Sequence, residues 1–134
     1  MPLDSEIYLS PTISKPERLR SLAKIFSKSI SELMLIAPRE ITFLISSNDD
    51  YPSVYDLKPL VESPAIEKKT DKIRLVMAVV YLLNCLSHEY GLTLWKSFFL
   101  AREEMWWKDR YSKSGYYRMR KQALNQFFTI SDAQ

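Results

Sequence analysis

The chain has 134 residues, of which 46% are hydrophobic, and 19 Lys and Arg against 16 Asp and Glu give it a net charge of +3. This length fits one domain, and so much apolar and aromatic content excludes a chain that is disordered throughout. Its two glycines disfavour glycine-rich phosphate loops and turn-dense β folds, which need many more.

Nothing in the sequence indicates export or membrane insertion. The start, MPLDSEIYLSPT, carries acids where a signal peptide carries basic residues. The most apolar stretch, 75–86, is interrupted by Asn84 and falls short of the roughly 18 residues that a transmembrane helix needs. The single cysteine, Cys85, cannot form an internal disulfide. We therefore expect a cytoplasmic protein without membrane contact.

The first helix is expected to begin at Ser14. The serine caps the helix, Glu17 three residues later completes a capping box, and Pro16 is tolerated in the first turn because its missing N–H costs nothing there. An apolar stripe at helical spacing follows: Leu19, Leu22, Phe26, Ile30, Leu33 and Met34.

The next two segments are less regular. Residues 38–47 fit a short helix with proline in its first turn, or a strand, because Ile41, Thr42 and Ile45 are β-branched. We favour the helix. Residues 48–64 contain three prolines and are predicted to be a connector with a single turn of helix.

The strongest helical pattern covers residues 71–89, with Thr70 as its cap and Gly91 at its end. Between Ile73 and Leu86 it is apolar on nearly every face, which predicts a helix surrounded by protein at the centre of the domain.

A further helical pattern covers residues 94–110, after a restart at Thr93. Its apolar and aromatic residues recur at helical spacing, and it fits one helix or two short helices broken near Ala101 or Arg102.

All predicted elements are helical, so the predicted fold is all-α and compact, built around the buried central helix. Residues 1–69 form an N-terminal helical and linker region, and 70–134 a C-terminal region, together one unit. The charge is uneven: residues 40–71 hold three basic and seven acidic groups, whereas residues 102–134 hold seven and four. The C-terminal end would therefore turn toward a polyanion.

The last predicted helix lies in YSKSGYYRMRKQALNQFF, residues 111–128, with Ser112 as its cap. Between Arg110 and Gln126 there is no acid, although a surface helix usually mixes Glu with Lys. The inward residues are expected to be Tyr116, Met119, Ala123, Leu124, Phe127 and Phe128. The outward residues are expected to be Lys113, Ser114, Tyr117, Arg118, Lys121 and Asn125, with Arg120 at the border.

The order of the predicted elements is that of a helix-turn-helix. Helical pieces come first, then a turn closed by serine, and then a helix that starts with small and basic residues. The segment resembles the recognition-helix segment of ArpU-type phage transcriptional regulators and, beyond them, the C-terminal promoter-binding domain of bacterial sigma factors. The resemblance rests on Tyr111, Ser112, Lys113-Ser114, Tyr116, Arg118-Met119-Arg120, Ala123-Leu124 and Phe127. It departs from the family pattern at two positions: Asp109 stands where the family usually has an apolar residue, and Arg110 stands where it usually has a small residue.

The resemblance implies a DNA-binding transcriptional regulator that acts on double-stranded DNA. Arg118, Ser114 and Tyr117 would reach base edges. Phosphate contacts would come from Lys113, Arg120 and Lys121, with Lys108 or Arg110. Because a lone helix-turn-helix binds weakly, a dimer or docking on RNA polymerase is expected.

Catalytic and metal chemistry have little support. His88 and Cys85 would share a helix face, but the chain has no other His or Cys to complete a metal site. No nucleophile, P-loop or dinucleotide motif occurs, so we expect no cofactor and no enzyme. Two alternatives stay open: a protein-interaction module whose basic helix docks on an acidic partner, and an RNA-binding accessory protein.

Overall fold

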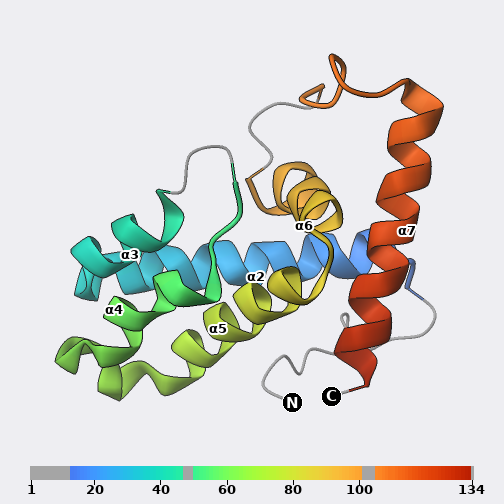
Figure 1. The fold of residues 1–134 in the computed structure, drawn as a ribbon. Coiled ribbons are helices and arrows are strands. Elements are labelled where there is room, and N and C mark those ends of the chain that lie inside the picture. The colour runs from blue at the N-terminus through green and yellow to red at the C-terminus, as the bar shows by residue number, and fades with distance from the viewer. Residues whose placement is uncertain (1–12, 47–49, 101–104, 134) are drawn as a thin grey trace.

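The computed structural model describes residues 13–46, 50–100 and 105–133, and in these residues every regular element is helical (Figure 1). The prediction of an all-α fold is therefore confirmed. The elements are α2 (Lys15–Ile36), α3 (Pro38–Ile45), η1 (Val54–Leu57), α4 (Lys58–Glu62), η2 (Pro64–Lys69), α5 (Thr70–Cys85), α6 (His88–Leu94), η3 (Trp95–Leu100) and α7 (Lys113–Asp132). The elements η1 and η2 are 3₁₀ helices, and η3 is π-helical.

Helix α2 joins the two ends of the molecule. Ser14 caps it as expected, since its hydroxyl accepts a hydrogen bond from the Glu17 amide (3.4 Å). The Glu17 carboxylate, expected to complete a capping box, pairs with Arg20. It packs against α3, α5, η3 and α7. Figure 1 shows α3 beside its C-terminal end and α7 beside its N-terminal end. The buried residues of its stripe are Leu19, Leu22, Phe26 and Leu33.

Residues 38–45 form a helix, as favoured, and not a strand. Pro38 is its first residue, and Ile41 and Leu44, three positions apart, are both buried. Spacing of this kind places both side chains on one helical face against the core, which a strand could not do.

The connector after α3 is more helical than expected. Ser53 and Asp56 form a reciprocal capping box at η1, with the Tyr55 amide donating to the Ser53 hydroxyl and the Ser53 amide donating to the Asp56 carboxylate. The short elements η1, α4 and η2 each bury one apolar residue in the core: Leu57, Leu60 and Ile66.

Helix α5 is buried on most sides but not on all. One stripe, formed by Arg74, Met77, Tyr81 and Cys85, is exposed, so the prediction of a helix surrounded by protein is wrong on that side. The other faces pack against α2, α6, α7, η1 and η2. None of the helices that the structure describes has both the length and the apolar composition needed to cross a membrane.

The predicted end of this helix is also wrong. Helix α5 stops at Cys85, and the Ser87 hydroxyl caps a new helix, α6, by accepting from the Tyr90 amide (3.3 Å). Gly91 and Thr93, expected to lie between helices, are both inside α6. The serine cap interrupted an apolar pattern that appeared continuous, because a capping hydroxyl competes locally with helix propagation.

Gly91 permits a close contact with the connector. A Cβ at this position would lie 2.8 Å from two ring atoms of Tyr51 and 3.0 Å from the carbonyl oxygen of Leu83. The glycine thus lets Tyr51 pack directly on α6, and burial, with the nearby Asp50 carboxylate, raises the pKa of Tyr51.

Substituting Gly91→Ala should lower the free energy of unfolding by about 1 kcal/mol, since overpacking costs roughly 1–3 kcal/mol and the better helix propensity of alanine returns about 1. Urea unfolding of the variant measures this loss. In a Tyr51→Ala background the same substitution should cost less than half as much. An equal cost in both backgrounds would contradict the role given to the ring.

Candidate nucleic-acid interface

The start of α7 is set by Ser112, as expected. Its hydroxyl accepts a hydrogen bond from the Gly115 amide (3.1 Å), and its carbonyl accepts from the Tyr116 amide (2.9 Å). No acid lies in the first turn, so the positive end of the helix dipole is not offset by a side chain of its own helix.

The two faces of α7 lie as the spacing indicates. The inward residues Tyr116, Ala123, Leu124, Phe127 and Phe128 are buried, and Met119 is half-buried. On the other side Lys113, Ser114, Tyr117, Arg118, Lys121 and Asn125 are exposed, and Arg120, expected at the border, is half-buried.

Three cations on the outward face are available to a partner. Within the described residues, Lys113, Arg118 and Lys121 take part in no ion pair. The one acid of α7, Asp132, pairs with Arg18 at the far end of the helix. We call Lys113, Arg118 and Lys121, with Ser114 and Tyr117, the basic face.

Arg120 has a different environment from these three. Its guanidinium carbon lies 5.2 Å from the ring centroid of Phe98 and 5.1 Å from that of Tyr117. Tyr117 is 45% exposed, and its ring also contacts Tyr116 edge-on at 5.0 Å. Arg120 is therefore held by aromatic rings, whereas Arg118 has no such contact with the described residues.

The element before α7 is not the expected supporting helix. Residues 105–110 form hydrogen-bonded turns, with the amides of Arg110 and Tyr111 both donating to the carbonyl of Trp107. A helix-turn-helix joins its helices through only about 3–4 residues, and the described part of the chain shows no such junction between η3 and α7. The break expected near Ala101 or Arg102 lies outside the described residues.

Aromatic contacts hold this turn against α7 instead. Trp107 stacks on Tyr116 with ring centroids 4.6 Å apart and planes 8° apart. Trp106 donates to the Ser97 hydroxyl (3.2 Å), which also bonds the Tyr116 hydroxyl. The bulky tryptophans thus replace helix packing as the support for the first turns of α7.

The turn is also tied to α6. The Tyr111 hydroxyl donates to the Glu89 carboxylate at 2.6 Å, and this hydrogen bond, with burial, raises the pKa of Tyr111. Lys108 and Arg110, considered above as phosphate contacts, are both exposed on this turn. They extend the cationic surface beyond the first turn of α7.

At its other end α7 is anchored on α2. Arg18 is buried, with its guanidinium carbon 4.1 Å from the ring centroid of Phe128 and its Nη2 3.2 Å from Asp132 Oδ1. Lys15 Nζ donates to Asn125 Oδ1 at 2.7 Å. These contacts fix the rotation of α7, and hence which of its residues face solvent.

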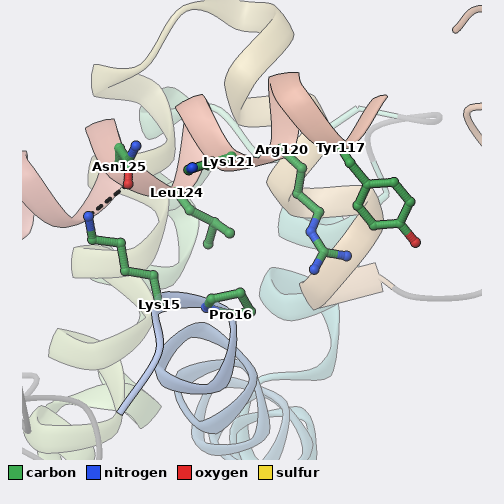
Figure 2. Close-up of a pocket in the computed structure, with 7 residues that line it drawn as sticks. All are labelled: Lys15, Pro16, Tyr117, Arg120, Lys121, Leu124 and Asn125. Atoms are coloured by element: carbon green, nitrogen blue, oxygen red, sulfur yellow. Dashed lines mark hydrogen bonds between the residues drawn. The ribbon is translucent and has the colours of Figure 1, made fainter. Parts of the chain in front are cut away.

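Lys15 is a cationic neighbour of α7 that sequence reasoning missed. It borders an open hollow of about 390 Å³ between the first turn of α2 and the middle of α7, which we call the α2–α7 hollow. Figure 2 shows Arg120 and Leu124 reaching from α7 toward Pro16, and Lys15 reaching up to Asn125. The lining residues are Lys15, Pro16, Tyr117, Arg120, Lys121, Leu124 and Asn125. No local pattern could have indicated this neighbour, because it lies in the distant N-terminal helix.

The expectation that His88 and Cys85 share a helix face is wrong. Cys85 ends α5 and His88 begins α6, so the two do not share a helix face. His88 Nε2 lies 2.9 Å from Asp50 Oδ2 instead. Among residues 13–46, 50–100 and 105–133, no three side chains of His, Cys, Asp or Glu are grouped so that they could hold a metal ion.

Comparisons of the chain with protein-family models, with curated proteins and with solved structures found no match in any of the three. The resemblance to ArpU-type regulators and sigma factors therefore stays a prediction that rests on residues 111–128.

The anchor at Arg18 gives a direct stability test. Substituting Arg18→Ala should lower the free energy of unfolding by about 2 kcal/mol, because it removes the packing of the guanidinium on Phe128 and its ion pair with Asp132. Lys24→Ala, at an exposed position of α2, should change it by less than about 0.5 kcal/mol. Urea unfolding of both variants makes the comparison. Equal losses would contradict the anchoring role of Arg18.

Proposed function

We propose that the basic face of α7 binds double-stranded DNA and that the chain acts as a DNA-binding regulator of transcription. The observation that supports this most is the set of exposed cations on a helix with no acid before its last residue, Asp132. Lys113, Arg118 and Lys121 take part in no ion pair within the described residues. A phosphate of a partner could therefore contact them without first breaking an ion pair with a described residue.

The dimensions of the helix suit this partner. An α-helix with its side chains is about 10–12 Å wide, close to the roughly 12 Å width of the DNA major groove. From Lys113 to Lys121 the helix rises about 12 Å, at 1.5 Å per residue. The cations could therefore meet several phosphates along one groove.

The first turns of α7 are the part best placed to enter a groove. Figure 1 shows them extending beyond α2 and α5, beside the turn that carries Lys108 and Arg110. Their outward side chains, Lys113 and Ser114, are exposed, and Ser114 is small. In this arrangement the turn of residues 105–110, through Trp106 and Trp107, supports α7 in place of the supporting helix of a helix-turn-helix.

The residues divide into two roles. Lys113 and Lys121 would contact phosphates, with Lys108 or Arg110 on the flank, and these contacts fix register without reading sequence. Arg118, Ser114 and Tyr117 would face base edges. Arg120, whose guanidinium contacts the rings of Phe98 and Tyr117, would contribute positive potential to the surface more than a flexible phosphate contact. A dimer or docking on RNA polymerase would add the affinity that one helix lacks.

The double substitution Arg118→Ala/Lys121→Ala should weaken binding to a labelled random duplex by at least about tenfold, since each lost contact is worth roughly 1–3 kcal/mol. Fluorescence anisotropy at low and at moderate salt measures the affinity. The matched control is Arg39→Ala/Lys58→Ala, which removes the same charges from exposed sites on α3 and α4.

Three outcomes would contradict the proposal. The first is a wild type that binds no duplex at all. The second is an equal loss of affinity in both double variants, which would indicate a net-charge effect alone. In the third, poly-glutamate binds as tightly as DNA, which would favour an acidic protein partner. Structured RNA added as a competitor separates DNA from RNA as the preferred polyanion.

Salt dependence checks the phosphate contacts separately. A plot of log affinity against log salt concentration should fall with a slope of roughly −0.9 per phosphate neutralised. Lys121→Ala should make this slope shallower by about one. Lys28→Ala, an exposed change on α2, should leave it unaltered, and a shallower slope for both would argue against a defined interface.

A further inference from the structure

We infer that the α2–α7 hollow is a binding site for a small organic oxyanion: a carboxylate or a phosphate monoester carried on a flat apolar group. Its volume of about 390 Å³ lies within the range of roughly 300–1,000 Å³ typical of small-molecule sites. The inference does not rest on DNA binding. Tyr117 and Lys121 belong to both surfaces, but the two residues that its variants test, Arg120 and Lys15, lie outside the basic face.

Arg120 is the residue that defines the chemistry. Phe98 and Tyr117 both lie within cation–π distance of its guanidinium, at 5.2 and 5.1 Å, so the group is held in place before any ligand arrives. Within the described residues it takes part in no ion pair. A guanidinium fixed through aromatic contacts still has its N–H groups to donate, and this fork matches a carboxylate or a phosphate.

Two lysines add to the positive charge from two separate helices. Lys15 begins α2 and Lys121 lies on α7, one residue beyond Arg120. Lys15 is held toward α7 by its hydrogen bond to Asn125, and an ammonium has two further N–H groups to donate. No acid is among the described residues that line the hollow, and the Glu17 carboxylate in the same first turn of α2 pairs with Arg20. These cationic groups would gain no charge-assisted hydrogen bond from an uncharged ligand, so they favour an anion.

Apart from Asn125, the other lining residues are apolar or aromatic, which points to an organic ligand over a bare ion. Leu124 and Pro16 face each other from α7 and α2, and the Tyr117 ring borders the same space (Figure 2). Proline has no N–H that would need a partner, so an apolar group can cover it without a desolvation cost. A flat group could therefore lie against these side chains with its acidic end toward Arg120 and Lys15.

The experiment is an NMR titration of the ¹⁵N-labelled chain with four probes: 2-naphthoate, 2-naphthyl phosphate, the neutral 2-naphthamide and inorganic phosphate. We expect saturable binding of one or both naphthyl anions, with amide shifts centred on Lys15, Tyr117, Leu124 and Asn125. The stronger of the two distinguishes a carboxylate site from a phosphate site. The amide and inorganic phosphate should each bind at least about tenfold more weakly, since a charged hydrogen bond and a buried aromatic group are each worth more than 1.4 kcal/mol.

Two single variants test the assignment of residues. Arg120→Met keeps the packing on the rings but removes the charge, and it should weaken the naphthyl anion about tenfold. Lys15→Met changes an exposed residue that the core does not need, so it tests the site even if the first variant folds poorly. Arg74→Met, exposed on α5, is the matched control and should not alter the affinity.

Several results would overturn the inference. These are a failure of both naphthyl anions to saturate, shifts centred away from the hollow, or equal affinity in Lys15→Met and in the wild type. Equal binding of inorganic phosphate and naphthyl phosphate would also overturn it, because the surface would then recognise charge alone.

Discussion

The contact between Arg18 and the last turns of α7 determines what the rest of the surface can do. Arg18 is only 8% exposed. A buried charge of this kind is costly unless it is paired, and here it is paired with Asp132 and packed against Phe128. This arrangement holds the first turns of α2 against the end of α7. Because a helix presents its residues at fixed angles, anchoring one end fixes the orientation of Lys113 and Arg118 at the other.

The opposite end of α7 is held by aromatic rings and not by a packed helix. Trp107 stacks on Tyr116, and Trp106 reaches the same tyrosine through Ser97. A stacked pair of rings is worth roughly 0.5–1.5 kcal/mol beyond the area that it buries. Two anchors at its ends therefore fix α7, and the proposed DNA contact uses a helix presented by a turn, which differs from the junction of a helix-turn-helix.

The cations of α7 fall into two physical classes. Lys113, Arg118 and Lys121 are exposed, and flexible cations of this kind suit the repeated phosphates of a polymer, for which position matters more than exact geometry. Arg120 is held by Phe98 and Tyr117, and a group held in place loses less conformational entropy on binding a small ligand. Helix α7 thus carries both the surface proposed to bind a polyanion and the preorganised site inferred for a small anion.

The sequence by itself determined the features that depend on neighbours a few residues apart. Helical spacing and the cap at Ser112 were enough to predict the faces of α7, and proline in a first turn was enough to favour α3 as a helix. The tertiary structure alone decided the role of Gly91, which depends on the Tyr51 ring, and the course of residues 105–110, where aromatic contacts prevailed over a helical pattern. It also decided that Lys15 meets α7. Helix periodicity is a local property of the chain, whereas packing and charge clusters arise from segments that only folding brings together, so no local pattern encodes them.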